Sequence, residues 1–327
     1  MELWCVHAGG VDPHPVEALE GLLARPDGFV WLDVATWDDA AEDVLTRVCG
    51  AHPRVVAACR QRNHVPTGHA YPSHVFLVLH TPVAGDAGHV HLLELDQLVG
   101  RRWLVSVHGP VNPAVDPQQA LVETESVRRR IEEGRFAPAS PAELSHALGS
   151  AVVRRQRELV GEVAERLPDL EQEAMAGDFR RPELLLERLF LVRHELVTVR
   201  TMAAQSHDVM TRIGSLDRMV PETDRALARD LADQFEVLRS FADGEREFLR
   251  GVIELYQTRV TTTMTLAMER LAVIAAVTLP VTALASIYGM NVIVNDSTRI
   301  PQLLLVLLVM ASVSGLLLRW TKKQGWW

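Results

Sequence analysis

Cysteine is scarce in this 327-residue sequence, and its three cysteines are widely spaced. Cys5, Cys49 and Cys59 form no Cys-x-x-Cys pair, so nothing in their spacing supports a thiol-based metal or redox motif. Isolated cysteines of this kind suit a reducing compartment, where we expect them to be small buried hydrophobic side chains.

Positive charge is also in short supply. The sequence has 33 Lys and Arg against 42 Asp and Glu, a formal net charge of -9 at pH 7. This negative net charge argues against a nucleic-acid partner. It fits a soluble domain that works near cations, but we favour an ordinary solvated acidic surface. No nucleophile–base constellation, phosphate loop or cofactor motif is present, so we do not expect an enzyme.

Two long stretches near the C-terminus contain no charged residue at all, residues 271–295 and 300–318. An uncharged apolar stretch of about 18 or more residues predicts a transmembrane helix, because a helix satisfies its own backbone across roughly 30 Å of hydrocarbon. The turn between the stretches is short. The two helices are therefore expected to form a hairpin with their other ends on the same side of the membrane.

The N-terminus shows no basic region followed by an apolar stretch, so we expect no signal peptide and a cytoplasmic N-terminal part. Arg270 precedes the first uncharged stretch, and Arg319, Lys322 and Lys323 follow the second. The positive-inside rule then puts both termini in the cytoplasm and the turn outside. The expectation is a multi-pass protein of the inner (plasma) membrane.

The first part of the chain alternates strand-like and helix-like runs, which predicts an α/β domain. Strands are expected at residues 28–34, 74–80, 89–95 and 102–107, and a helix from Trp37 to Val48. The capping box Ser140-Pro141-Ala142-Glu143 then predicts a helix that ends at about Pro168. A second helix from about Pro182 to Ile213 would pair with it as an antiparallel hairpin.

The longest predicted helix begins after Pro221 and runs from Glu222 to Tyr288, a length of about 100 Å at 1.5 Å per residue. A helix of this length that enters a membrane needs partners, and a bundle of identical copies supplies them. The fold class is an α+β membrane protein. Its expected parts are a cytoplasmic α/β domain (1–135), a cytoplasmic helical hairpin (140–220), a long stalk and first transmembrane helix (221–288), an outer turn (289–299), a second transmembrane helix (300–320) and a cytoplasmic tail (321–327).

Three motifs in the long helix resemble one family. Glu269-Arg270-Leu271, Leu279-Pro280-Val281-Thr282 and Ile287-Tyr288-Gly289-Met290-Asn291 are similar to the first membrane helix and the Gly-Met-Asn signature of the CorA-type divalent metal cation transporters. The resemblance implies a homopentamer in the lipid bilayer, in which five copies of the long helix line one pore. It also implies that Gly289, Met290 and Asn291 form a selectivity filter at the outer mouth.

Physical chemistry supports that role for Asn291. Mg²⁺ gives up its water reluctantly, so a first filter should bind the hydrated ion through oxygen acceptors. A ring of Asn291 carbonyls accepts hydrogen bonds from those waters without holding the ion tightly. Gly289 lets the chain turn there. A plain helix C-terminus is the alternative interpretation of these residues.

One face of the long helix would line the pore. Helical spacing from Asn291 selects Ser286, Thr282, Leu279, Ala275, Leu271, Met268 and Thr265. The three hydroxyl residues would face hydrated ions, whereas the leucines and Met268 would form apolar rings that close the pore by dewetting. Helix–helix packing is the alternative role for several of them.

The sequence departs from the family pattern at three places. Asp296 is the only acid in the outer turn, where many relatives carry a Met-Pro-Glu-Leu run, while Thr265 and Ser286 replace an asparagine and a glycine. The predicted function is passage of Mg²⁺, or Co²⁺ or Ni²⁺. A zinc transporter similar to the ZntB branch, which also lacks that run, and a non-conducting membrane-anchored metal sensor stay open as alternatives.

The family's regulation implies a further cation site between cytoplasmic domains. Glu254 is the candidate ligand on the stalk helix, and a solvated glutamate is the alternative. Beyond the divalent cation, transported or regulatory, no covalently bound cofactor is expected. The histidines at 64, 69, 74, 80, 89 and 91 match no familiar zinc spacing, although a structural zinc site remains an alternative.

Overall fold

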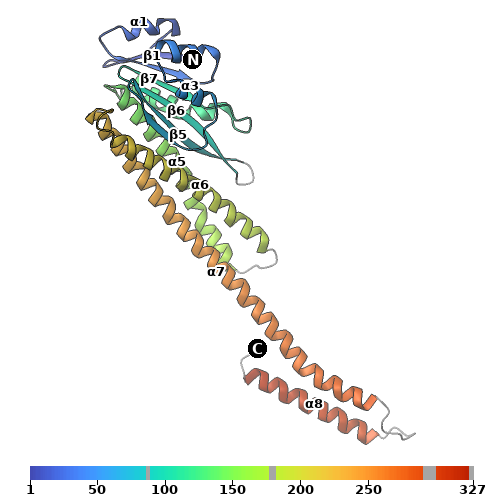
Figure 1. The fold of residues 1–327 in the computed structure, drawn as a ribbon. Coiled ribbons are helices and arrows are strands. Elements are labelled where there is room, and N and C mark those ends of the chain that lie inside the picture. The colour runs from blue at the N-terminus through green and yellow to red at the C-terminus, as the bar shows by residue number, and fades with distance from the viewer. Residues whose placement is uncertain (86–88, 177–181, 290–299, 324–327) are drawn as a thin grey trace. The chain divides into compact units, whose positions relative to one another are not determined.

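The computed structural model describes residues 1–85, 89–176, 182–289 and 300–323 (Figure 1). The chain divides into two compact units. The first comprises Met1–Glu173 and Arg180–Ile253, and the second comprises Ala174–Phe179 and Glu254–Trp327.

A mixed seven-stranded sheet forms the centre of the first unit, with the strand order β2-β1-β3-β7-β6-β5-β4. Only the β3–β7 pair is parallel, and it sets Trp31 opposite Leu104. The other neighbouring strands are antiparallel. The strands are β1 (Glu2–His7), β2 (Gly10–His14), β3 (Phe29–Val34), β4 (Thr67–Ala70), β5 (His74–Ala84), β6 (Val90–Gly100) and β7 (Trp103–His108).

The four strands expected from β-branched and aromatic runs are confirmed as β3, β5, β6 and β7, while β1, β2 and β4 were missed. The two edge strands carry weak signals. β2 contains Pro13 and buries none of its residues, and β4 is a four-residue strand with a glycine at position 68. Edge strands need neither a full set of backbone donors nor an apolar face, so composition does not reveal them.

Helices cover both faces of the sheet (Figure 1). On one face, α1 (Leu19–Leu23), α2 (Asp39–Asp43), a π-helical turn (Val44–Val48) and α3 (Pro53–Arg60) pack on the apolar side chains of β1, β3 and β7. On the other face, α5 meets the sheet through Ser145 Oγ, which donates to Gln97 Oε1 at 2.6 Å. The helix expected at residues 37–48 begins two residues later, at Asp39. Only its first half, α2, is an α-helix, and its second half, Val44–Val48, is the more loosely wound π-helical turn.

The helical pair after the sheet consists of α5 (Pro141–Ala176) and α6 (Pro182–Gly214). Arg166 pairs with Glu195, and Arg188 Nη1 lies 2.5 Å from Glu173 Oε2, so the two helices run in opposite directions, as expected. The prediction that α5 ends near Pro168 is wrong, because the helix continues eight residues further. Its neighbours Leu167 and Leu170 are buried, and this packing outweighs the backbone hydrogen bond that a proline removes.

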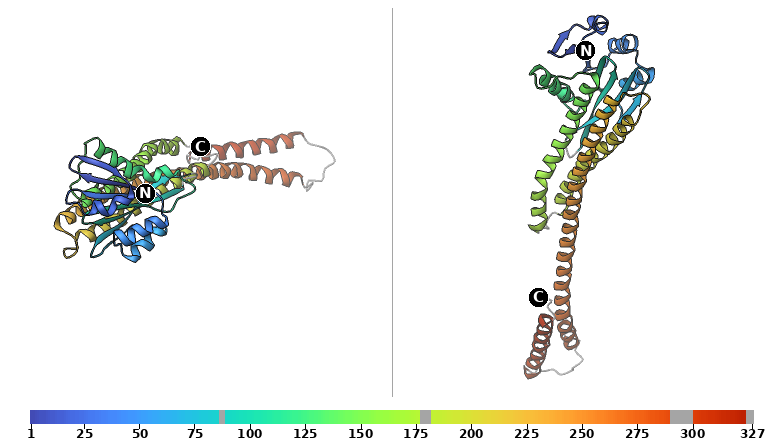
Figure 2. Two further views of the ribbon diagram at one scale, coloured as in Figure 1. Left: turned by 90° about the horizontal axis from the view of Figure 1, so that it is seen from above. Right: turned by 90° about the vertical axis from the view of Figure 1, so that its left-hand side faces the viewer.

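The long helix is α7 (Glu222–Gly289), and it includes Pro280 without a break. In the second unit, α8 (Ile300–Lys323) returns beside the last part of α7, as Figures 1 and 2 show. α8 extends to Lys323, three residues beyond the expected end at 320, and this extension includes the buried Thr321. The expected division into six parts stays a prediction.

Candidate ion pathway

In the last third of α7 and in α8, most side chains whose exposure the structure describes are apolar, and most of these are exposed. These are the two helices in the described ranges that are long and apolar enough to cross a membrane. Leu279 is 67% exposed and Leu308 is 67% exposed. A core helix of a soluble protein buries such side chains, so these surfaces require lipid or further protein around them.

The least exposed side chains of the second unit form one stripe on each helix. On α7 beyond Arg270 they are Val273, Ala276, Val277, Pro280, Val281 and Leu284. On α8 they are Val306, Met310, Val313, Ser314, Leu317 and Thr321. Both sets follow the three- and four-residue spacing of a single helix face. These stripes are the faces on which α7 and α8 pack together.

All seven predicted pore residues lie on α7 and are exposed in the single chain: Thr265, Met268, Leu271, Ala275, Leu279, Thr282 and Ser286. At about 100° per residue, they centre roughly 180° from the stripe that faces α8, with Thr265 at the edge of the set. The structure therefore brings the predicted residues onto one face and leaves that face uncovered by α8.

The two threonine hydroxyl groups on this face are oriented by their own helix. Thr282 Oγ1 donates to the Thr278 carbonyl at 2.8 Å, and Thr265 Oγ1 donates to the Thr261 carbonyl at 3.0 Å. A hydroxyl that donates its hydrogen to the backbone keeps only acceptor lone pairs for other partners. The water molecules around a cation point their hydrogens outward, so such oxygens suit a hydrated cation.

Of the predicted filter, the structure describes only Gly289. Gly289 is the last residue of α7, and Met290, Asn291 and Asp296 fall outside the described residues. Glu254, the candidate regulatory ligand, is exposed on α7, and its carbonyl accepts from Thr258 Oγ1 at 2.8 Å. Within the described ranges, no three His, Cys, Asp or Glu side chains of one chain gather as a metal site. The six histidines weighed as zinc ligands therefore do not gather into one site, although the His89 and His91 rings lie 4.6 Å apart.

Sequence reasoning missed a buried polar cluster on the sheet face that α3 covers. Glu94 and Asp96 are buried there, and Glu94 accepts from the Asn63 backbone at 2.8 Å. His80 Nε2, on the facing strand, donates to the Asn63 carbonyl at 2.7 Å. Two acids at i and i+2 in a mostly apolar strand were the signal that could have revealed the cluster.

Burial changes the titration of this cluster. It raises the pKa of Asp96 well above its ordinary value, and the neighbouring Glu94 carboxylate adds to the effect. Burial also raises the pKa of the Cys59 thiol and lowers the pKa of His80. The cluster thus favours the neutral forms of these groups, as expected where a low-dielectric environment penalises charge.

Asp96→Asn is expected to stabilise the protein increasingly as the pH rises. A carboxyl whose folded-state pKa is raised contributes its full stability below its unfolded pKa, and this contribution is lost as the pH rises toward the folded pKa. The uncharged asparagine avoids that loss, so the variant should gain on wild type by about 1.4 kcal/mol per pH unit above roughly pH 4. Urea unfolding across pH measures the difference.

The exposed Asp169 of α5 offers a matched control for this test as Asp169→Asn. A free-energy difference between Asp96→Asn and wild type that stays constant from pH 4 to pH 8 would contradict the prediction.

Comparison with known proteins identifies a family that matches most of the chain. The family described as CorA-like Mg²⁺ transporter protein matches residues 26–323. The chain is 23% identical over 280 residues to YfjQ of Bacillus subtilis strain 168, a protein named as a metal ion transporter, and covers 82% of it with 85% of its own length. It is 24% identical over 299 residues to the cobalt/magnesium transport protein CorA of Thermotoga maritima, covering 80% of that protein with 87% of its own length.

A solved structure agrees with the fold over the full length. The CorA magnesium transporter of Methanocaldococcus jannaschii superposes with a TM-score of 0.79, covering 100% of this chain and 99% of that chain. At 15% sequence identity, this likeness establishes the fold. The family match and the arrangement of α7 and α8 lead to one conclusion. The chain belongs to the CorA-like Mg²⁺ transporter protein family, and it is therefore a divalent cation transporter and not an enzyme.

Proposed function

We propose that five copies of this chain surround one pore, which their α7 helices line, and that Mg²⁺, Co²⁺ or Ni²⁺ passes through it down its electrochemical gradient. The observation that carries the proposal is the uncovered face of α7, which lies opposite the stripe packed on α8. That face combines oriented threonine hydroxyls with apolar side chains, a mixture that suits a water-filled path better than lipid.

The number of copies follows from the family resemblance, and the need for copies follows from the single chain. Two helices cannot enclose a path for an ion, because each covers only one face of the other. Neighbouring copies would cover the sides of α7, while α8 would lie between α7 and the lipid. The exposed apolar side chains of α8, such as Leu308, would then meet the bilayer.

The chemistry along the pore would change from polar to apolar. The filter residues Gly289, Met290 and Asn291 would receive the hydrated ion at the outer mouth, where Asp296 adds negative charge. Ser286 and Thr282 would follow with oxygen acceptors. Rings of Leu279, Leu271 and Met268 would exclude water when the pore is closed. The positive residues that flank the two spans would keep both termini in the cytoplasm of a cell whose inner (plasma) membrane holds the protein.

Regulation would use the same ion. In the proposed assembly Glu254 would approach a carboxylate of a neighbouring copy, and a divalent cation between the two would relieve their repulsion. Loss of the cation would push the copies apart. The transported ion would thereby report its own cytoplasmic concentration.

Influx into proteoliposomes tests the proposed function, with Mg²⁺ and Zn²⁺ compared side by side. Mg²⁺ entry down its gradient, without a pH gradient, is the expected result. Preferential Zn²⁺ entry would replace the proposal with the zinc transporter, an alternative favoured by the single acid, Asp296, in the outer turn. A pentamer that passes no divalent cation would indicate the non-conducting sensor.

A further inference from the structure

Four arginines surround one hollow in the first unit, on the face of the sheet that α5 covers. The hollow has a volume of about 390 Å³ and lies between α4 (Val122–Glu132), the segment that follows it, and α5. Its polar lining consists of Glu125, Ser126, Arg129, Arg130, Arg135 and Arg154. This concentration of positive charge stands out in a chain whose net charge is -9.

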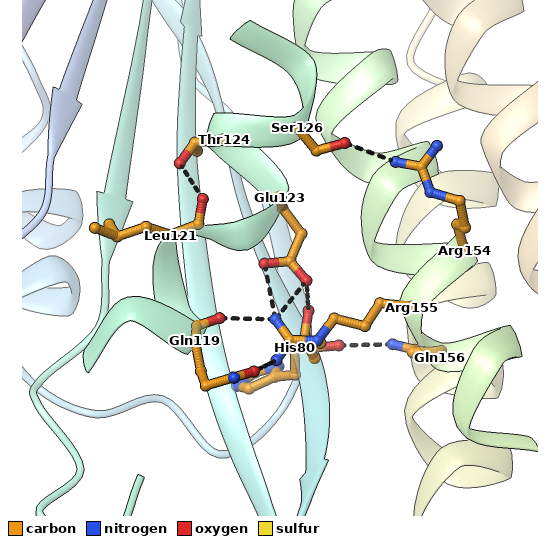
Figure 3. Close-up of polar contacts among 10 residues, drawn as sticks. His80, Gln119, Leu121, Glu123, Thr124, Ser126, Arg154, Arg155 and Gln156 are labelled. Carbon is orange, nitrogen blue, oxygen red and sulfur yellow. Dashed lines mark hydrogen bonds and ion pairs between the residues drawn. The ribbon is translucent and has the colours of Figure 1, made fainter. Parts of the chain in front are cut away.

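A buried ion pair holds the two helices that shape the hollow. Arg155 Nη1 on α5 lies 3.1 Å from Glu123 Oε1 on α4 and donates to the Gln119 carbonyl at 2.7 Å (Figure 3). Glu123 also accepts from Thr81 Oγ1 of β5 at 3.1 Å. Glu123 is buried and Arg155 half-buried, so these contacts fix α4 against α5 and the sheet. The two helices that frame the hollow are therefore fixed to each other.

The neighbouring Arg154 behaves differently. Its Nη2 donates to Ser126 Oγ at 3.2 Å, across from α5 to α4, as Figure 3 shows. Arg130 lies over the Phe136 ring, with its guanidinium carbon 5.2 Å from the ring centroid. Within the described part of the chain, neither of these arginines nor Arg129 is ion-paired, whereas Arg135 pairs with Glu133. Three guanidinium groups thus share the hollow without a carboxylate of their own.

The charge balance of the lining indicates the charge of a ligand that would bind in the hollow. Three unpaired guanidinium groups against the single carboxylate of Glu125 leave an excess of positive charge, which suits a ligand with two or more negative charges. Guanidinium groups match phosphate oxygens with pairs of parallel hydrogen bonds. Ser126 Oγ accepts from Arg154, so its own hydrogen remains available to a ligand oxygen. The volume falls within the range of roughly 300–1,000 Å³ of small-molecule sites.

We propose that this hollow is a binding site for a soluble phosphate-bearing anion, a polyphosphate or a nucleotide polyphosphate, held by Arg129, Arg130 and Arg154 with Ser126. The anion would relieve the repulsion among the three guanidinium groups and would tie α4 to α5. Since α5 packs on α6 and on the sheet, the ligand would stiffen the first unit as a whole. The site does not depend on the pore and would exist whichever cation is transported.

Titration of the full-length protein in detergent with sodium tripolyphosphate tests the proposal. EDTA removes divalent cations, and sodium chloride of equal ionic strength serves as the reference. Isothermal calorimetry should show saturable binding to wild type. Arg129→Gln and Arg154→Gln should each weaken it about ten- to a hundredfold, the effect of losing a hydrogen bond to a charged group. Binding should also raise the thermal midpoint of unfolding of wild type.

Arg157→Gln provides the matched control, because Arg157 is exposed on α5 only three residues beyond Arg154 and does not line the hollow. Circular dichroism of each variant shows whether the fold is retained, and the exposed positions of Arg129 and Arg154 make retention the expected result. Equal binding by all three variants, or no binding of tripolyphosphate at millimolar concentration, would overturn the proposal. So would binding confined to vesicles of anionic phospholipid.

Discussion

Asn291→Ala is expected to abolish divalent cation influx into proteoliposomes. In the proposed filter, the side-chain carbonyl of Asn291 accepts hydrogen bonds from the waters of the entering ion. Alanine removes that acceptor from every copy at once, so a hydrated Mg²⁺ would meet an apolar ring instead of a polar one. Because Mg²⁺ exchanges its water reluctantly, it would keep its hydration shell, and the alanine ring would offer those waters no acceptor. Influx should fall to the level of protein-free liposomes.

Asn295→Ala is the matched control, since it removes the same amide group four residues further along the proposed outer turn. That variant should retain most of the influx. Cross-linking or light scattering should show the same oligomer for both variants and wild type. Unchanged influx in an intact Asn291→Ala oligomer would remove Asn291 from the filter and would favour a plain helix C-terminus at this position.

A cysteine at position 282 is expected to react with a small cationic thiol reagent added from the outer side. In the proposed pore, Thr282 lies on the water-filled face of α7 and outward of the apolar ring at Leu279. A thiol reacts as its thiolate, which forms in water and not in hydrocarbon. Leu308→Cys on α8, which would face lipid, should stay unmodified. Mass spectrometry of the reconstituted protein measures both.

The native cysteines do not obscure this experiment. Cys5, Cys49 and Cys59 are buried, and burial raises the pKa of Cys49 to about 12 and that of Cys59 further. The thiolate forms of Cys49 and Cys59 are therefore very scarce near neutral pH, and Cys5 is buried away from the reagent, so wild type should give little background. Equal modification at positions 282 and 308, or modification at 308 alone, would show that the uncovered face of α7 does not line an aqueous path.

The elements that sequence reasoning predicted well are those with a strong local signal. α6 begins at Pro182 and α7 begins after Pro221, because proline fits the first turn of a helix and stops the segment before it. The end of α5 was predicted eight residues too early for the same reason. Proline is a local signal, and the burial of Leu167 and Leu170, which carries the helix through Pro168, is decided by distant parts of the chain.

The candidate pore face was also accessible from sequence, since positions on one helix are related by a fixed rotation. What spacing could not show is which face α8 covers. The pore residues were counted from Asn291, and the covered stripe was found independently on the opposite side of α7. The Glu94–Asp96 cluster was missed because its partners Asn63 and His80 come from other segments.

The sequence by itself determined that two stretches of this protein are long and apolar enough to cross a membrane and that a long helix leads into the first of them. An uncharged stretch and an unbroken helical spacing of apolar residues are properties of residues close together in the sequence, so they can be recognised without knowing the tertiary structure. Only the tertiary structure decided which charges meet. It pairs Arg155 with Glu123 and leaves Arg154 facing a hollow, although the two arginines are adjacent in the sequence. Successive residues of a helix point about 100° apart, so one reaches a buried acid and the next does not.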